Sequence, residues 1–285
     1  MALRINYNYQ ADFTHFNLKQ TEYNMNKALE RLATGYRINR AADDAAGLYI
    51  ADQLKTYAIS LEQGTRNSQD GISIAQIAQA SLQNVYNILN DIKSKAIEAA
   101  NDSQDDATRE IIQQDINKLV DVISKIFSDT EFNGKKIFKS SKNTFTIHYG
   151  GRTNQNLTMD IWTAVATAAA TASSPSTITI AASGFTIDVT SQAKAEKAIK
   201  NIDDLIKKVD QLNALIGSYQ IELEKIVTNN ESQRINVQEA ESRIRNVDFA
   251  KEMSEFTRNQ ILMQSGTAML AQANQLPQLV LQLLR

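Results

Sequence analysis

The chain has 285 residues, 42% of them hydrophobic, which is enough to bury a substantial core and excludes disorder throughout. Its 30 Lys and Arg nearly balance 32 Asp and Glu, so a net charge of −2 provides no single-sign field for nucleic acid or anionic lipid. The absence of cysteine excludes disulfides, thiolate metal sites and cysteine nucleophiles, and we expect no cofactor.

No apolar run approaches the roughly 18 residues needed to span a bilayer, so we expect no membrane span. The first residues lack the basic and then apolar pattern of a cleaved signal peptide. Such a chain either stays in the cytoplasm or is exported by a dedicated apparatus. Its two prolines, Pro175 and Pro277, are few enough to favour long uninterrupted helices.

Residues 1–40 carry scattered apolar positions, and we expect a helix there whose apolar side needs a partner. Residues 41–138 carry apolar residues spaced three and four apart in two stretches, which predicts a helical hairpin. Between the two stretches, Ser103 or Asp105 is expected to accept hydrogen bonds from the free amides of the second helix. Asp43 and Asp44 resemble a metal or acid–base pair, but no third ligand converges on them. We interpret them as a helix start.

Residues 139–191 change from helical to alternating periodicity, which predicts two β-hairpins with an exposed insertion between them. The alternating apolar residues of the first hairpin are Phe145, Ile147, Tyr149, Leu157, Met159 and Ile161. The second hairpin is predicted around Ser183-Gly184, with Ile187 and Val189 in its second strand. The insertion between the hairpins has a low-complexity composition that usually marks a plain linker. Its candidate O-glycosylation sites are Thr171, Ser173, Ser174, Ser176 and Thr177.

Residues 192–248 carry the strongest periodic signal, two apolar stripes at the a and d positions of a heptad. They predict one helix on the order of 85 Å long. Asn230 and Gln233 interrupt both stripes, and such a polar layer fixes register or marks a joint. Burial of one stripe cannot offset about 1–2 kcal/mol per residue of backbone ordering, so this helix must pack on the hairpin of residues 41–138. The expected bundle core is Leu82, Val85, Leu89, Ile92, Ile116, Leu119, Ile123, Ile202, Leu205, Val209, Leu212, Ile216, Tyr219, Leu223 and Ile226.

Residues 249–285 end in the strongly apolar LPQLVLQLLR, which exposes apolar area in a single chain and favours a partner surface. The alternative is a tail folded on its own core. The expected self-assembly residues at the two ends of the chain are Leu3, Ile5, Leu29, Leu32, Ile38, Ile261, Leu262, Leu279, Val280, Leu283 and Leu284. The predicted fold is mainly α, a long coiled-coil bundle that joins the N- and C-terminal segments, with a small β-hairpin region in the middle.

No motif in the chain indicates catalysis. His15 and His148 have no Ser or Asp arrangement that sequence ties to nucleophilic chemistry. Gly150-Gly151 lacks the Lys-Ser/Thr that follows a phosphate-binding loop. We therefore expect no catalytic, cofactor-binding or metal site and no enzymatic activity.

Two distant stretches carry a family resemblance. RLATGYRINRAADDAAGLYIADQL (31–54) and RNSQDGISIAQ (66–76) resemble the N-terminal signature of bacterial flagellins, and EFNGKKIF (131–138) resembles their turn into the β region. Residues 239–285 resemble the flagellin C-terminus along their whole length. Because both stretches occur in the right order and at the right ends, they are more specific together than any single short motif.

The resemblance implies a structural subunit that self-assembles into the extracellular filament of the bacterial flagellum and serves motility. It places residues 1–40 and 249–285 in the inner filament core, 41–138 and 192–248 in the bundle outside it, and 139–191 on the surface. The implied partners are further copies in a helical homopolymer, an export chaperone on the C-terminal segment, the flagellar type III export apparatus, the filament cap and the hook–filament junction proteins. Export through that apparatus needs no cleaved signal peptide.

One departure from the family pattern concerns recognition by the innate immune Toll-like receptor 5. Flagellins that this receptor recognises present an Arg and, four residues on, a Leu, where this chain aligns Asp91 and Lys95. A reversed charge and a lost apolar anchor both oppose that contact, so we expect weak receptor activation.

Two alternatives stay open at this point. The hook–filament junction protein shares the terminal design but usually diverges from AADDAAG and ANQLPQ, which are both present here. A generic coiled-coil structural protein predicts a discrete small oligomer, whereas a flagellin predicts open helical growth.

Overall fold

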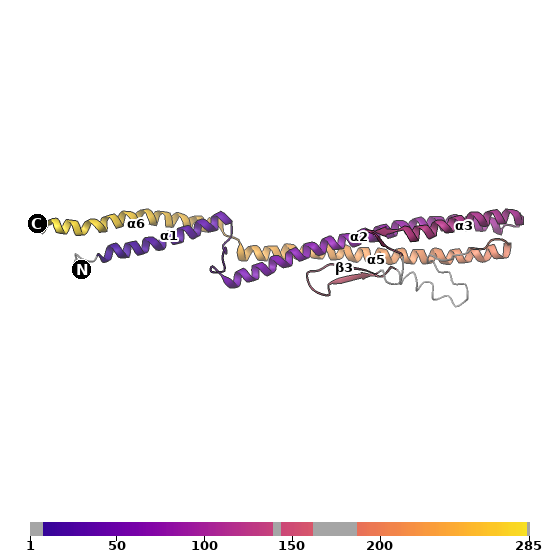
Figure 1. The fold of residues 1–285 in the computed structure, drawn as a ribbon, viewed down its shortest axis with the longest axis horizontal. Helices are drawn as coiled ribbons and strands as arrows, with labels where there is room; N and C mark the ends of the chain where they lie inside the picture. Colours follow the sequence, from indigo (N-terminus) through magenta and orange to yellow (C-terminus); the bar gives the residue numbers. More distant parts are fainter. Residues whose placement is uncertain (1–7, 139–143, 162–186, 284–285) are drawn as a thin grey trace. The chain divides into compact units, whose positions relative to one another are not determined.

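The computed structural model describes residues 8–138, 144–161 and 187–283, and these are mainly helical with two short β-hairpins (Figure 1). The elements in chain order are α1 (Tyr9–Thr34), α2 (Ala45–Ala100), α3 (Asp106–Asp129), β1 (Glu131–Phe132), β2 (Lys135–Lys136), β3 (Phe145–His148), β4 (Asn156–Met159), α5 (Gln192–Arg245) and α6 (Phe249–Leu283). The predicted mainly α fold is confirmed. No helix within the described ranges is both long and apolar enough to cross a membrane.

The chain divides into two compact units. The terminal unit combines Met1–Ala58 with Ile235–Arg285, and the bundle unit is Ile59–Arg234. Both boundaries fall inside long helices, α2 and α5, whereas the predicted segments end where helices end. The division into units thus follows packing partners rather than helix ends.

The bundle unit is built from α2, α3 and α5, whose apolar stripes share one core. Lys93 of α2 pairs with Asp203 of α5 (2.6 Å), and the earlier Gly71 lies beside the later Leu223, so α5 runs antiparallel to α2. Lys95 pairs with Asp115 of α3 (3.2 Å), and the earlier Ser81 accepts from Thr130 at the end of α3, so α3 also runs antiparallel to α2. The buried core residues of the three helices include Leu82, Val85, Leu89, Ile92, Ile116, Ile123, Ile202, Leu205, Val209, Leu212, Ile216 and Leu223. The other three expected core residues, Leu119, Tyr219 and Ile226, are only partly buried, and Val120 takes the buried position next to Leu119.

Two charged side chains order the connection between α2 and α3. Asp105 is the N-cap of α3 and accepts a hydrogen bond from the Thr108 amide, which settles the choice between Ser103 and Asp105. Arg109 is buried, and its guanidinium donates to the carbonyl oxygens of Ala99 (3.0 Å) and Asn101 (3.2 Å). The Ala99 carbonyl lies in the last turn of α2, where carbonyl oxygens lack a partner within the helix.

The two described hairpins differ in how their turns are made. β1 and β2 pair through Asn133-Gly134, whose positive φ angles of 48° and 76° fit the two-residue turn that matches strand twist. β3 and β4 pair with Phe145 opposite Met159 and Ile147 opposite Leu157, as the alternating pattern predicts. Phe145, Ile147 and Met159 are buried in the bundle core. The middle hairpin is therefore a covering layer of the bundle.

The second predicted hairpin lies largely outside the described residues, and its described end differs from the prediction. Ile187 and Val189 are buried but belong to no strand. The Gln113 side chain of α3 donates to the Ile187 carbonyl and accepts from the Val189 amide at 2.7 Å. The Gln113 side chain thus makes the hydrogen bonds that a neighbouring strand would otherwise make with this backbone.

The polar break in the α5 stripes holds the end of β3. Asn230 is 4% exposed, and its amide donates to the Tyr149 carbonyl at 2.6 Å. Asn67 on α2 donates to the neighbouring His148 carbonyl at 2.8 Å. Gly64 lets the backbone approach α2, because a Cβ there would lie 2.1 Å from the Tyr149 oxygen. The polar interruption of the α5 stripes at Asn230 is therefore the position where the hairpin of β3 and β4 is held.

This contact predicts opposite effects for two Gly→Ala substitutions in helices. We expect Gly64→Ala to destabilise the bundle unit by about 1–3 kcal/mol, since the new methyl group displaces the Tyr149 backbone. Gly217→Ala meets nothing within 4 Å, so helix propensity alone predicts stabilisation by about 0.5–1 kcal/mol. Urea unfolding of both variants measures the difference, and two substitutions with the same sign would contradict the docking.

Candidate self-assembly surface

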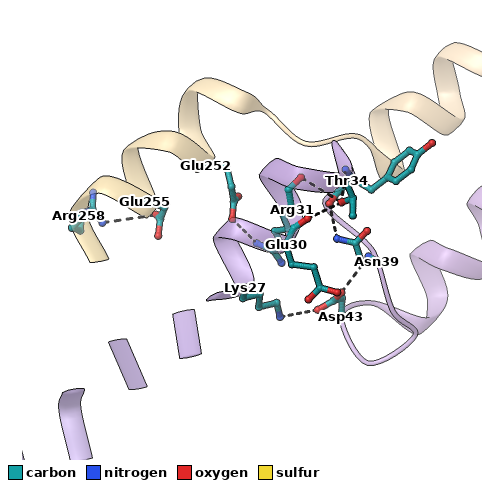
Figure 2. Close-up of polar contacts among 10 residues, drawn as sticks. Lys27, Glu30, Arg31, Thr34, Asn39, Asp43, Glu252, Glu255 and Arg258 are labelled. Atoms are coloured by element: carbon teal, nitrogen blue, oxygen red, sulfur yellow. Dashed lines mark hydrogen bonds and ion pairs between the residues drawn. The ribbon is translucent and has the colours of Figure 1, made fainter. Parts of the chain in front are cut away.

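The two ends of the chain form one antiparallel helix pair, α1 with α6 (Figure 1). Near the start of α1, the side-chain amide of Asn8 donates to the Ala273 carbonyl of α6 at 2.8 Å. Near the end of α1, Arg31 pairs with Glu252 at 3.3 Å (Figure 2). These two contacts fix the direction and the register of the pair.

The contact seam of this pair is made mainly of small and polar side chains, with four larger apolar ones, Leu18, Met25, Met263 and Leu270, among them. Residues turned toward the partner helix alternate three and four apart, as in a coiled coil. They include Ala11, Thr14, Leu18, Thr21, Met25, Ala28, Asn259, Met263, Gly266, Leu270 and Ala273. Among the described side chains of α1 and α6, only Ala28, Asn259 and Ala273 are buried. A Cβ at Gly266 would lie 2.8 Å from Leu18 Cδ1, so the helices approach closely there.

The large apolar side chains of both helices stand outside the seam. Their exposed fractions reach 67% at Phe16 and 64% at Met269. The ten residues of this outer surface are Tyr9, Phe13, Phe16, Tyr23, Leu29, Phe249, Met253, Ile261, Leu262 and Met269. Tyr9 and Phe13 stack with ring centroids 6.1 Å apart, and they line an open groove with Leu262 and Met269. The pair thus departs from ordinary burial, because its fully buried side chains among the described ones are small or polar, whereas ten large apolar side chains are exposed.

The predicted self-assembly residues fall into three groups. Leu29, Ile261 and Leu262 belong to the outer surface, and Leu32 is half-buried. The prediction is wrong for Ile38, because this side chain is only 1% exposed and is covered by its own chain. The third group is Leu3, Ile5 and Leu284, which lie outside the described residues, and Leu279, Val280 and Leu283, whose backbone is helical but whose side chains lie outside them.

Sequence reading did not place the aromatic residues Phe13, Phe16, Tyr23 and Phe249 on this surface. The sequence pattern that would have located these aromatic residues is the spacing of the seam residues on α1. Once Ala11, Thr14, Leu18 and Thr21 are recognised as one face of α1, the aromatic residues between them must point elsewhere. Because Ala and Thr do not resemble a helix-packing stripe, hydrophobic periodicity alone misses it.

A short two-stranded link joins the terminal helices to their neighbours in the chain. The Arg37 amide donates to the Arg245 carbonyl at 2.7 Å, and the Val247 amide donates to the Gly35 carbonyl at 3.0 Å. The Arg245 guanidinium lies 4.6 Å from the Tyr36 ring centroid and pairs with Asp52 at 3.4 Å. Gly35 ends α1 with a φ of 75°, which glycine adopts without strain. The N- and C-terminal segments are thus tied together by backbone as well as by side chains.

Asp44 caps the start of α2, as its sequence context indicates, whereas Asp43 holds the turn before it. Asp44 accepts from the Gly47 amide at 2.9 Å at the start of α2. Asp43 accepts from the amides of Asn39 and Arg40 and pairs with Lys27 at 2.8 Å (Figure 2). The hydrogen bond from Lys27, with those two amides, lowers the pKa of Asp43 to about 2. No cluster of three or more His, Asp or Glu side chains with metal-site geometry occurs within the described residues.

The remaining predicted positions are divided between described and undescribed parts of the chain. Asp91 is exposed on α2, and Lys95 pairs with Asp115 of α3. The five candidate O-glycosylation residues, Thr171, Ser173, Ser174, Ser176 and Thr177, lie outside the described residues.

Comparisons with known proteins identify the class and the family. Residues 5–143 match the bacterial flagellin N-terminal helical region, and residues 199–284 match the bacterial flagellin C-terminal helical region. The flagellin of Halalkalibacterium halodurans is 38% identical over 281 residues, and the alignment covers 99% of each chain. The flagellin of Bacillus subtilis is 38% identical over 304 residues, covering 99% of this chain and 100% of that one. A crystal structure of Bacillus cereus flagellin has a TM-score of 0.46 and 22% identity, covering 58% of this chain and 88% of that one.

The helical fold and these matches define a structural protein of a helical filament. The chain belongs to the bacterial flagellins. It is a structural subunit of the extracellular flagellar filament and serves motility.

The Lys27–Asp43 pair predicts a pH dependence. Because an unfolded Asp titrates near pH 4, ionised Asp43 stabilises the fold above about pH 4 and this contribution is lost as pH falls through about 2. We expect Lys27→Met to raise the pKa of Asp43 and to destabilise the terminal unit by about 1–2 kcal/mol at pH 6, with most of this difference lost at pH 2. Carboxyl NMR titration and unfolding at both pH values measure this, with exposed Lys19→Met as the control. A pKa of Asp43 unchanged by Lys27→Met would contradict it.

Proposed function

We propose that this flagellin polymerises through the outer surface of α1 and α6, which neighbouring copies cover in the filament. The supporting observation is the reversed burial of the pair. Ten large apolar side chains stand outside a seam that is made mainly of small and polar ones. An apolar surface of this kind on a single chain favours a protein partner.

The energies of this surface are consistent with assembly. Burying the exposed half of one large apolar side chain contributes about 1 kcal/mol, so ten together supply on the order of 10 kcal/mol. Association costs about 4–15 kcal/mol in lost translational and rotational freedom. The thin seam contributes little core of its own, so ordering of the two ends is coupled to polymerisation.

The proposal also includes the protein partners that the family resemblance implies. An export chaperone binds the segment 249–285 before assembly, because this apolar helix must be shielded until copies meet. The flagellar type III export apparatus delivers the chain, the filament cap guides its addition, and the hook–filament junction proteins contact the first subunits. In each of these roles the chain acts as a building element without enzymatic activity.

The two alternatives are less well supported. Curated relatives that align along 99% of this chain are named flagellins, which disfavours the hook–filament junction protein. Filament abundance separates these two, because a junction protein is present in few copies. A generic coiled-coil protein requires a discrete oligomer, which electron microscopy of seeded protein distinguishes from open growth.

Single substitutions on the outer surface test the proposal. We expect Phe16→Gln and Leu262→Gln each to raise the critical concentration for seeded polymerisation about tenfold, because each removes an apolar contact that forms only between copies. Helix content should not change, since both side chains are at least half exposed in the single chain. His15→Gln, an exposed polar residue on α1, is the matched control. Normal growth by both variants would refute this surface.

The departures at Asp91 and Lys95 support weak activation of Toll-like receptor 5. Asp91 presents a negative charge on the exposed face of α2, and Lys95 is engaged with Asp115 rather than offering an apolar anchor. Both features oppose a contact built on Arg and Leu.

A gain of function tests this expectation. The double variant Asp91→Arg with Lys95→Leu should activate a receptor reporter cell at a concentration at least about tenfold lower than the original chain. The exposed Lys95–Asp115 pair contributes little to stability, so the fold should be unchanged. Asp121→Arg, an exposed charge reversal on α3, is the control. Strong signalling by the unchanged monomer would overturn the assignment.

A further inference from the structure

The turn between β1 and β2 contains the only Asn-Gly dipeptide of the sequence, Asn133-Gly134. Both residues are exposed. Within the described ranges, no hydrogen bond engages the Asn133 carboxamide or the Gly134 amide. A Cβ at Gly134 would meet nothing within 4 Å, so the space around this nitrogen is open. An accessible side-chain carbonyl is therefore followed by a free backbone nitrogen without a bulky neighbour.

A second asparagine in a turn shows what is particular to Asn133. Asn154, between β3 and β4, is also exposed and has a positive φ of 70°. The residue that follows it is Gln155, which carries a side chain and whose amide donates to the Arg152 carbonyl at 3.4 Å. Asn154 thus shares the left-handed backbone of Asn133 but is followed by an engaged nitrogen next to a bulky side chain.

We propose that Asn133-Gly134 is an autocatalytic modification site, at which Asn133 converts to isoaspartate and thereby weakens the packing of the bundle unit. The Gly134 nitrogen attacks Cγ of Asn133 and gives up its proton, and the side-chain nitrogen leaves as ammonia. The product is a cyclic succinimide. Water then opens the ring, and cleavage at the backbone carbonyl yields isoaspartate, whereas cleavage at Cγ yields aspartate. No electrons are transferred in either step.

Isoaspartate does not fit the turn that Asn133 and Gly134 make. In isoaspartate the main chain passes through Cβ, so the loop becomes one carbon atom longer. The pairing of Phe132 with Lys135 depends on a two-residue loop of matching twist. A longer loop therefore opposes the register of β1 with β2.

The hairpin is coupled directly to the bundle core. Ile137 follows β2, is completely buried, and donates its amide to the Thr130 carbonyl at 3.0 Å. The next residue, Phe138, is 4% exposed and packs edge-on against Phe127 of α3, with ring centroids 5.1 Å apart. A shifted turn displaces these anchors, so the modification destabilises the core as well as adding a surface charge.

Incubation of the full chain in mildly alkaline, isotope-labelled water tests the site. Peptide mass spectrometry should find solvent oxygen at Asn133 at a rate at least about tenfold above that at Asn154, because glycine leaves the attacking nitrogen unhindered. An isoaspartate-specific methyltransferase with labelled S-adenosylmethionine should mark the same peptide. Asn133→Gln should abolish both signals, since its longer side chain closes the ring far less readily. Equal rates at Asn133 and Asn154, or aspartate as the sole product, would overturn the site.

Urea unfolding of the separated isoaspartate fraction tests the effect on the core. Its midpoint should lie below that of freshly prepared Asn133→Asp, the matched control with the same charge on an unaltered backbone. The Asn133→Asp midpoint should stay close to that of the original chain, because the side chain is exposed. Equal midpoints for the isoaspartate fraction and Asn133→Asp would overturn the proposed weakening of the bundle.

Discussion

The pairing of α1 with α6 through mainly small and polar side chains is the constraint on which the function of this chain depends. A helix pair that buries Ala28, Asn259 and Ala273 has little core of its own. Its large apolar residues, such as Phe16 and Met269, therefore stay on the outside. Because such a surface gains stability only when something covers it, the pair is suited to a repeating partner and poorly suited to independence.

In the bundle unit, large apolar side chains are buried between the helices. Its seams carry Leu and Ile, and residues such as Ile92, Ile116 and Ile202 are completely covered. Large side chains inside a helix bundle supply the burial that a folded unit needs without neighbours. One chain thus contains a self-sufficient part and a dependent part, and the difference lies in which side of each helix carries the bulky residues.

Hydrophobic periodicity predicted the bundle and the first hairpin well, since both depend on patterns within a single segment. The buried residues from Ile202 to Leu223 and the pairing of Phe145 with Met159 follow directly from spacing. Three features escaped it because each joins one structural element to another. Arg109 caps another helix, Gln113 holds the backbone beside Ile187, and Asn230 docks the end of β3. None of these roles has a local signature.

The sequence by itself determined the helical class, the coiled-coil core and the family, because periodicity and long motifs are properties of the chain alone. It also marked the ends of the chain as apolar. Tertiary structure decided which apolar residues remain available, since exposure depends on what another segment covers. Ile38 is covered by its own chain, while Phe16 stands exposed on α1. The exposure of Phe16 is decided where α1 meets α6, more than two hundred residues away in sequence, so no window of sequence contains it.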